Sequence, residues 1–293
     1  MWSSNARGPV RPRRSALYVP ADNARALEKA RTVDADVLLF DLEDAVAPAA
    51  KDAARAQLAE ALGRGTFGRR EKVVRVNGQA GPWAAEDLRM VAACGADAVL
   101  LPKVESAAEV RVVEAALAAN RAPADLALWA MIETPAGVLR AAAIAEATPR
   151  LRCLVAGTSD LVKDLQARHT AGRAEVLTAL SLIVLAARAA GLACLDGVHL
   201  DLADEAGFEA ACAQGRDLGF DGKTLIHPRT VAAANRIFGP GEAELAEARK
   251  VVAAHRAAEA EGRGVVVVDG RLVEALHVAA AERLLALAEA IAG

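Results

Sequence analysis

The sequence is poor in the features that mark nucleic-acid-binding proteins. Aromatic residues make up 3% of its 293 residues, and its formal net charge of -3 leaves no basic excess. No block of lysines and arginines is interleaved with aromatic residues. Because such proteins neutralise phosphates with clustered positive charge and stack bases on aromatic rings, we expect no nucleic-acid partner.

Cysteine is also scarce, and its spacing forms no ligand pattern. The four cysteines lie far apart, without a CxxC pair or a Cys/His spacing typical of zinc, at Cys94, Cys153, Cys194 and Cys212. The sequence therefore predicts neither a zinc site nor a disulfide framework.

Long hydrophobic runs are missing, although 54% of the residues are hydrophobic. The chain begins with a locally basic segment that contains Arg11, Arg13 and Arg14. The apolar stretch after this segment is far too short for a signal-peptide core or a membrane span. We expect a cytoplasmic protein with no membrane partner.

What the sequence does contain is a regular alternation of short apolar runs with alanine-rich segments of helical spacing. The apolar runs fall at residues 15–20, 37–43, 73–77, 98–104, 126–133, 151–160, 192–200 and 221–227. Alternating strands and helices of this kind predict a parallel sheet covered by helices, and eight units match a (β/α)8 TIM barrel of the α/β class. A doubly wound open sheet is the alternative, but "YVPADN" stands after the first strand where a glycine-rich dinucleotide fingerprint would be expected.

The barrel is expected over residues 1–235, and a C-terminal helical extension over residues 236–293. Residues 241–261 have the pattern of a helix, "VVVVDGRLV" that of a hairpin turning at Asp269 and Gly270, and the last segment that of a closing helix. The extension is therefore predicted to be a helix, a hairpin and a helix.

Carboxylates gather where the second predicted strand ends, in "VLLFDLEDAV". The active site of a TIM barrel lies at the carboxyl ends of its strands. Side chains alternate along a strand, so Asp41 and Glu43 face the same way. We interpret both as catalytic or site-organising groups, whereas Asp44 fits a helix cap equally well.

Two further acids follow consecutive strands. Glu133 ends "ALWAMIE" and Asp160 follows "LVAGTS", so both are expected at the same barrel mouth, on strands about 4.8 Å apart. Two carboxylates in this position can share a hard divalent cation and leave the other coordination positions to water or substrate, which suits Mg²⁺. Each acid alone would fit a helix cap.

Arg75 lies inside the apolar strand "VVRVN". A buried arginine needs an anionic partner, and its planar fork can bind a carboxylate at two points. We interpret Arg75 as a substrate-binding and catalytic residue. A structural ion pair with Asp41 or Glu43 is an alternative that does not exclude this role.

These motifs together resemble one known family. The segments "RSALYVPADNARALEKA", "LLFDLEDAVAPAAKDAAR", "VRVNG", "LLPKVES", "IETPAGV", "AGTSDL" and "DGKTLIHP" occur in an order similar to that of the citrate lyase beta-chain and malyl-CoA lyase family, within the HpcH/HpaI aldolase superfamily. The likeness runs from about residue 14 to the C-terminus.

The resemblance implies a TIM barrel that assembles as trimers or larger homo-oligomers and cleaves or forms carbon-carbon bonds in 3-hydroxyacyl thioesters. It implies that Glu133 and Asp160 bind Mg²⁺, with Mn²⁺ as an alternative ion, and that Arg75 contacts substrate. The family places its proton donor on an aspartate in a C-terminal segment that reaches a neighbouring subunit. Glu274 occupies the matching position in this chain, so its carboxylate stands one methylene further out. A helix N-terminal charge is the alternative role for Glu274.

No Walker-type loop marks a site for the phosphates of coenzyme A. Arg14, Lys51 and Arg55 are candidate phosphate contacts near the first strands. The resulting hypothesis is a Mg²⁺-dependent lyase that converts a malyl-CoA or citramalyl-CoA type thioester to an acyl-CoA and glyoxylate or pyruvate. The alternatives are a citryl-ACP lyase beta subunit, a malyl-CoA thioesterase, and a non-catalytic assembly or regulatory subunit.

Overall fold

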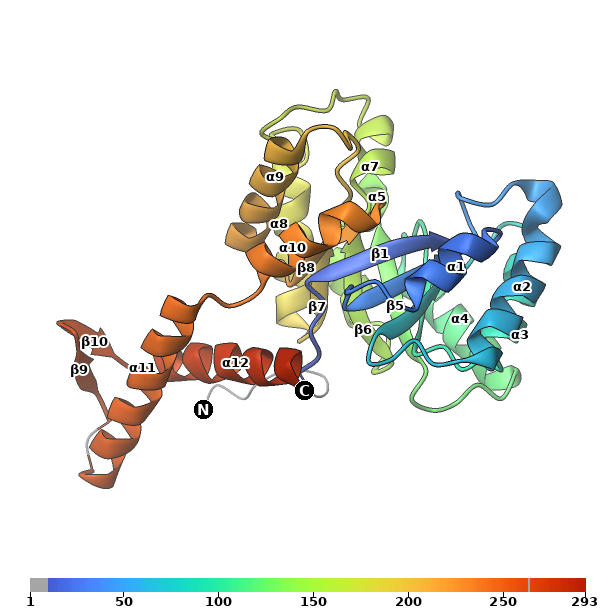
Figure 1. Cartoon of the computed structure of the whole chain (residues 1–293). Helices are drawn as coiled ribbons and strands as arrows, with labels where there is room; N and C mark the ends of the chain where they lie inside the picture. Colours follow the sequence, from blue (N-terminus) through green and yellow to red (C-terminus); the bar gives the residue numbers. More distant parts are fainter. Residues whose placement is uncertain (1–9, 263) are drawn as a thin grey trace.

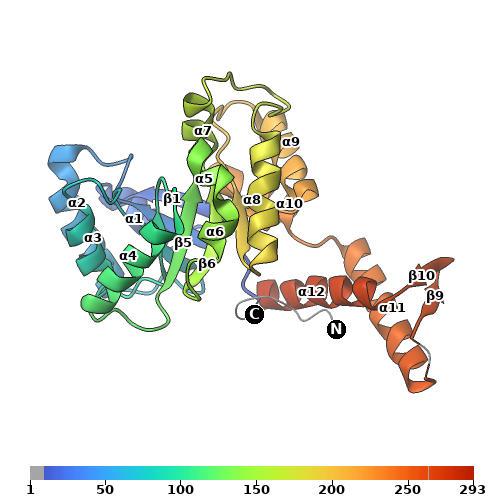
Figure 2. The same cartoon turned by 180° about the vertical axis from the view of Figure 1, so that it is seen from behind.

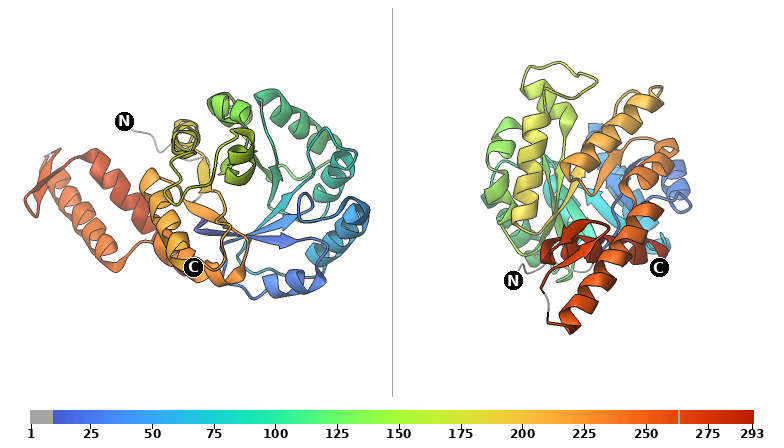
Figure 3. Two further views of the ribbon diagram at one scale, coloured as in Figure 1. Left: turned by 90° about the horizontal axis from the view of Figure 1, so that it is seen from above. Right: turned by 90° about the vertical axis from the view of Figure 1, so that its left-hand side faces the viewer.

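The computed structural model describes residues 10–262 and 264–293 and shows a closed barrel of eight parallel strands in the order β1 to β8. Figure 3 shows the ring of strands seen along its opening, with helices around it. The strands are β1 (Ser15–Pro20), β2 (Val37–Asp41), β3 (Glu71–Arg75), β4 (Ala98–Leu101), β5 (Ala127–Ile132), β6 (Leu151–Ala156), β7 (Ala193–Asp196) and β8 (Gly222–Leu225). The predicted (β/α)8 barrel is confirmed, and the open sheet is excluded.

Each strand buries both of its faces, which explains why the strands are apolar without interruption. One set of alternate side chains fills the barrel interior, and it includes Val37 and Leu39 of β2 and Val73 of β3. The other set packs against the surrounding helices and includes Leu38 and Phe40 of β2. Because Asp41 continues the inward-facing series of β2, its carboxylate points into the barrel mouth.

Helices and two short 3₁₀ turns connect the strands and cover the barrel (Figures 1 and 2). Their bounds are α1 (Ala24–Ala30), η1 (Pro48–Ala50), α2 (Lys51–Arg64), α3 (Ala84–Val91), α4 (Ala107–Ala119), α5 (Pro135–Leu139), α6 (Ala141–Ala145), α7 (Thr158–Asp164), α8 (Leu177–Ala189), α9 (Glu205–Leu218), η2 (Pro228–Thr230) and α10 (Val231–Phe238). Across the described part of the chain, none of the helices is long and apolar enough to cross a membrane.

The C-terminal extension consists of α11 (Glu242–Ala260), the hairpin strands β9 (Val266–Val268) and β10 (Arg271–Val273), and α12 (Ala275–Ala292). The hairpin turns at Asp269 and Gly270, both in the left-handed region with φ of 46° and 79°. This is the geometry of a two-residue Asp-Gly turn. The extension has a small core of its own in which Val252, Val273 and Val278 take part.

The extension is attached at the amino-terminal end of the barrel, away from the mouth. Arg69, which precedes β3, donates a hydrogen bond of 2.5 Å to the carbonyl of Ile291 at the end of α12. Arg216 of α9 binds both carboxylate oxygens of Glu244 in α11, at 2.5 and 2.7 Å. From this anchorage α11 and the hairpin project outward (Figures 1 and 3).

Candidate active site

Arg75 and Asp41 form the centre of one half of the barrel mouth. They are the last residues of β3 and β2 and lie opposite each other in the strand register. Arg75 Nε donates to Asp41 Oδ1 at 2.8 Å, and Arg75 Nη2 donates to Asp41 Oδ2 at 2.6 Å. The guanidinium also lies 5.0 Å from the centre of the Tyr18 ring, within the range of a cation–π contact. Burial opposes the charge, but the hydrogen bonds to Asp41 raise the pKa of Arg75, so it stays a cation.

Glu43 links this half of the mouth to the other half. The chain turns after β2 because Asp41 accepts hydrogen bonds from the backbone N–H groups of Glu43 at 2.9 Å and Ala45 at 3.2 Å. Glu43 Oε2 then lies 2.9 Å from Arg75 Nη1, and Glu43 Oε1 accepts a hydrogen bond of 2.7 Å from Lys103 Nζ. Burial raises the pKa of Glu43, although Arg75 acts to lower it.

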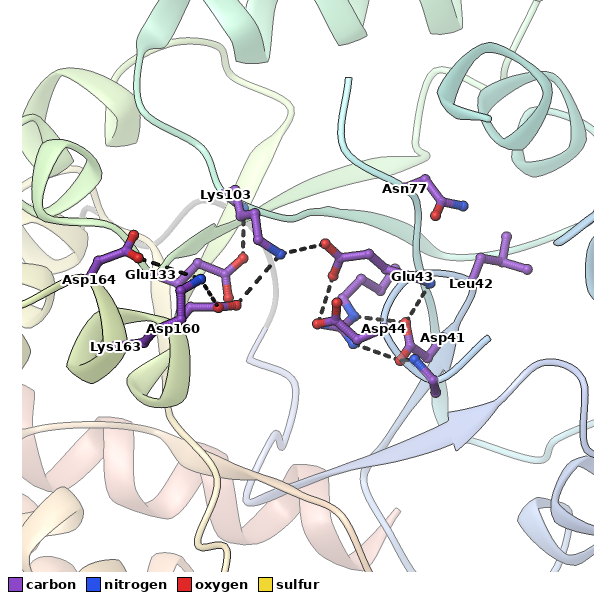
Figure 4. Close-up of polar contacts among 12 residues, drawn as sticks. Asp41, Leu42, Glu43, Asp44, Asn77, Lys103, Glu133, Asp160, Lys163 and Asp164 are labelled. Atoms are coloured by element: carbon purple, nitrogen blue, oxygen red, sulfur yellow. Dashed lines mark hydrogen bonds and ion pairs between the residues drawn. The ribbon is translucent and has the colours of Figure 1, made fainter. Parts of the chain in front are cut away.

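The structure brings the two predicted metal ligands together in the other half of the mouth (Figure 4). Glu133 follows β5 directly and is 3% exposed, and Asp160 lies in the first turn of α7 after β6. Lys103 Nζ approaches Asp160 Oδ2 at 3.5 Å, and Lys163 Nζ approaches Asp160 Oδ1 at 3.3 Å. Burial raises the pKa of Glu133 to about 7. A cation bound there would therefore compete with a proton near neutral pH.

A glycine makes room for Glu133. A Cβ atom at Gly157, between β6 and α7, would lie 2.4 Å from the Cβ and 2.5 Å from Oε2 of Glu133. Any other residue would therefore push the Glu133 side chain out of place. The backbone of Lys103 fixes the same carboxylate from the other side, through a hydrogen bond of 2.8 Å to Oε1.

The donor set fits a hard divalent cation that takes few ligands from the protein. No group of three or more His, Cys, Asp or Glu side chains with metal-site geometry occurs within residues 10–262 and 264–293. Two neighbouring carboxylates at the barrel mouth leave the remaining positions to water and substrate oxygens. This is the usual arrangement for Mg²⁺.

Lys103 is the functional candidate that the sequence analysis left out. It follows β4 in "LLPKVES" and contacts Glu43, Glu133 and Asp160. Its φ of 50° lies in the left-handed region, which is uncommon for a lysine and recurs at functional sites. The signal in the sequence was a lysine at a strand's carboxyl end, but its backbone conformation was not readable there.

The three candidate phosphate contacts lie in different places. Lys51 is close to the mouth, but its ammonium is buried and donates to the carbonyls of Leu42 and Glu43 at 2.7 and 2.6 Å. Arg55 binds Asp87 and Asp52, both at 2.8 Å. These contacts stabilise the fold around the second and third strands.

Arg14 lies at the opposite end of the barrel from the mouth. It precedes β1 and binds Asp36, which precedes β2, through two side-chain hydrogen bonds of 2.8 Å. It also lines a pocket between the barrel and the extension, together with Asn235 and Ile291. Arg14, predicted as a phosphate contact near the first strands, therefore lies at the amino-terminal end of the barrel, away from the mouth.

Glu274 is not near the mouth of its own barrel. It precedes α12 at the outer end of the extension, is exposed, and its backbone N–H donates to His277 Nδ1 at 3.0 Å. This hydrogen bond between the Glu274 backbone and the His277 side chain caps the first turn of α12. A helix of 18 residues spans about 27 Å, so Glu274 is far from the anchored end of α12.

An open pocket of about 410 Å³ adjoins Glu43 on the outer side of the mouth. It lies between the loops that follow β2 and β3, and Asp44, Lys51, Asn77 and Trp83 are among its lining residues. Arg75, Asp41 and Glu43 together are called the Arg75 cluster. The pocket provides space beside this cluster for a substrate larger than a small acid.

The fold and the mouth define a TIM-barrel protein whose charged groups converge at the carboxyl ends of the strands, as in enzymes of this architecture. Residues 14–228 match HpcH/HpaI aldolase/citrate lyase, and the chain belongs to this family.

Individual relatives cover nearly the whole chain. It is 49% identical over 281 residues to a (3S)-malyl-CoA thioesterase of Cereibacter sphaeroides (strain KD131 / KCTC 12085), covering 96% of both chains. It is 39% identical over 285 residues to citrate lyase subunit beta of Escherichia coli (strain K12), covering 96% of this chain and 94% of that one.

Solved structures are similar over most or nearly all of the chain. Protein CitE from Mycobacterium tuberculosis, in complex with magnesium, acetoacetate and coenzyme A, matches with a TM-score of 0.74 and 33% identity, covering 97% of this chain and 99% of that one. The citrate lyase beta subunit of M. tuberculosis complexed with oxaloacetate and magnesium matches with a TM-score of 0.66 and 33% identity, covering 81% of this chain and 99% of that one. The predicted family is confirmed.

Proposed function

We propose that the protein is a Mg²⁺-dependent carbon-carbon lyase that acts on a malyl-CoA or citramalyl-CoA type thioester. The observation that carries the proposal is the convergence of Glu133 and Asp160 with the Arg75 cluster through the shared contacts of Lys103 and Glu43. The similar CitE protein was crystallised with magnesium, acetoacetate and coenzyme A, and magnesium and coenzyme A are ligands that this mouth would need to accept.

Glu133 and Asp160 would hold the metal ion. When bound, Mg²⁺ would supply a Lewis acid that polarises the hydroxyl oxygen and fixes the adjacent carboxylate of the substrate. Gly157 and the backbone of Lys103 keep Glu133 in its position, so the protein fixes one ligand before the ion arrives.

Arg75 would stabilise negative charge on the substrate. Asp41 holds two guanidinium nitrogens and so fixes the plane of the group, while Nη1 faces Glu43 at 2.9 Å and Asp44 at 3.2 Å, two residues that also line the pocket. Oriented donors of this kind act on charge as it develops without having to reorganise.

The proposed reaction breaks the bond between the hydroxyl-bearing carbon and the carbon next to the thioester. The hydroxyl gives up its proton and becomes the carbonyl of glyoxylate or pyruvate, and the carbon next to the thioester takes up one proton to complete the acyl-CoA. We assign this second proton to Glu274 of a neighbouring subunit, with Asp41 and Glu43 as the next candidates.

The surface around Glu274 supports a contact between subunits. Val265, Val267, Leu272 and Leu276 are between 49% and 65% exposed on or beside the hairpin. An apolar group of this kind on a projecting element is typical of an interface. We therefore propose that residues 236–293 pack on a second barrel (residues 1–235) in a homotrimer or a multiple of it.

A malyl-CoA thioesterase is the second candidate, because a relative 49% identical to this chain has that activity. A thioesterase would add water to the thioester and release malate and coenzyme A without breaking the carbon skeleton. A citryl-ACP lyase subunit or a regulatory subunit would be inactive toward the CoA ester when purified alone.

The test is to incubate the purified chain with (3S)-malyl-CoA or citramalyl-CoA and Mg²⁺ and to identify the products by chromatography. Glyoxylate or pyruvate together with acetyl-CoA supports the lyase. Malate with free coenzyme A supports the thioesterase, and no product from either substrate contradicts both.

A further inference from the structure

Lys103 occupies a position that the proposed reaction does not explain. Its ammonium lies 2.7 Å from Glu43 Oε1 and 3.5 Å from Asp160 Oδ2, so it stands between Glu43 and the two proposed metal ligands, Glu133 and Asp160 (Figure 4). A cation held beside two prospective metal ligands must affect how a second cation binds there.

The other described cations of the mouth are either bound to carboxylates or exposed to solvent. The guanidinium of Arg75 is bound to Asp41 and faces Glu43 and Asp44. Lys163 lies 3.3 Å from Asp160, but its side chain is 72% exposed, so water and salt weaken its effect. Of the cations described at the mouth, Lys103 is thus the least screened near Asp160, since its side chain is 41% exposed and also held by Glu43.

The two contacts of the Lys103 side chain are unequal. The bond to Glu43 is a close charged hydrogen bond, whereas the approach to Asp160 is longer than a hydrogen bond of good geometry. A divalent ion at Asp160 would therefore displace the weaker contact and leave the bond to Glu43 in place.

We propose that the Lys103 side chain acts as a resident counter-ion that competes with the divalent cation for Asp160 and lowers the metal affinity of the site. The inference rests on the proposed function, because it assumes that Glu133 and Asp160 bind the ion. Lys103 is a positioning residue in this account: its backbone N–H holds Glu133 while its ammonium opposes the ion.

The backbone and the side chain of Lys103 have separate effects in this account, so the inference can be tested by changing the side chain alone. Replacing the side chain by methionine leaves the backbone N–H that binds Glu133 and removes the charge. Mg²⁺ would then meet less repulsion at Asp160, and we expect its dissociation constant to fall about tenfold. A purely structural role for the Lys103 side chain predicts weaker binding in the same variant.

The experiment is isothermal titration calorimetry of the full chain with MgCl₂ at one ionic strength, on wild type and on Lys103→Met, Lys103→Gln, Lys103→Arg and Lys163→Met. Circular dichroism confirms that each variant is folded. Tighter binding in Lys103→Met and Lys103→Gln, with Lys103→Arg close to wild type and Lys163→Met changed by less than about threefold, supports the inference.

Two outcomes overturn it, and they are distinguishable. If wild type binds Mg²⁺ but Lys103→Met and Lys103→Gln bind it equally or more weakly, the counter-ion role is wrong and the metal site stands. If wild type does not bind Mg²⁺ and the Glu133→Gln variant behaves identically, the metal assignment in the proposed function fails together with the inference.

Discussion

Arg75 and Asp41, the terminal residues of neighbouring strands, are joined by two hydrogen bonds of 2.8 and 2.6 Å that form a planar fork. This pairing satisfies the buried arginine and fixes its orientation. Nη1 of the same guanidinium lies 2.9 Å from Glu43 Oε2, so Arg75 forms the structural ion pair that the sequence suggested with both Asp41 and Glu43.

Replacing Arg75 with lysine tests the fork. Lysine keeps the charge but cannot make two parallel contacts to Asp41 while offering a third donor, so we expect kcat/KM to fall about tenfold or more. Arg55→Lys is the matched control, because Arg55 also binds two carboxylates but lies in α2. The measurement is the steady-state kinetics of both variants. A wild-type kcat/KM for Arg75→Lys would show that Arg75 has only a structural role.

Replacing either proposed metal ligand with its neutral amide should abolish activity without unfolding the protein. Glu133→Gln and Asp160→Asn are nearly isosteric, so we expect folded proteins that lose measurable Mg²⁺ binding and nearly all turnover, because hard anionic oxygens are what the ion prefers. Asp164→Asn is the control, since Asp164 lies on the same helix and pairs with Lys163 at 3.5 Å. Full activity in Glu133→Gln or Asp160→Asn would remove the metal assignment.

Gly157→Ala should damage the site through packing alone. The added methyl would overlap Glu133, with a Cβ to Cβ separation of 2.4 Å, so the carboxylate must move. We expect Mg²⁺ affinity to fall by about tenfold or more, because a displaced Glu133 carboxylate can no longer bind the ion. Gly78→Ala is the comparison, because a Cβ there meets nothing within 4 Å. Equal Mg²⁺ dissociation constants for the two variants would show that Glu133 can shift without losing the ion, or that it is not a ligand.

Much of the architecture was predictable from the sequence because both faces of each barrel strand are buried, which leaves an uninterrupted apolar run. The same pattern placed Asp41 and Glu133 at strand ends, whereas Arg75, expected inside its strand, is the last residue of β3. The Asp-Gly pair predicted the hairpin at Asp269 and Gly270. Asp160 lies in the first turn of the helix that follows its strand, and Arg14 precedes β1 and so lies at the amino-terminal end of the barrel.

The contacts of Lys103 could not be predicted, because they depend on a left-handed backbone and join residues that follow three other strands, Glu43, Glu133 and Asp160. The distance of Glu274 from the mouth of its own barrel likewise depends on how the extension docks on the barrel, which local sequence patterns do not encode.

Glu274→Gln tests the proton donor. We expect proton exchange at the acetyl-CoA methyl group to fall by about 10²–10⁴-fold, as for loss of a general acid, while Mg²⁺ binding stays intact. Glu274→Asp restores the shorter carboxylate of the family and shows whether reach matters: a gain in turnover would mean that the glutamate weakens the site, and a loss would mean that the backbone is adjusted to it. Glu282→Gln, on the same helix, serves as the control.

Mixing two inactive variants tests the origin of that acid. A mixed assembly of Glu133→Gln and Glu274→Gln chains should regain activity, because some mouths combine an intact Glu133 with an intact Glu274 from the neighbour. The absence of any recovery after subunit exchange, verified by mass spectrometry of the assembly, would contradict a donor supplied between subunits.

The most direct measurement of the central claim is the fate of the carbon skeleton when the enzyme acts on (3S)-malyl-CoA in D₂O with Mg²⁺, followed by mass spectrometry of the products. Cleavage through a thioester enolate predicts glyoxylate together with acetyl-CoA that carries at least one deuterium in its methyl group, and it predicts that Glu133→Gln forms neither. Malate without carbon-bound deuterium, released with free coenzyme A, would contradict carbon-carbon cleavage and assign this barrel mouth to thioester hydrolysis.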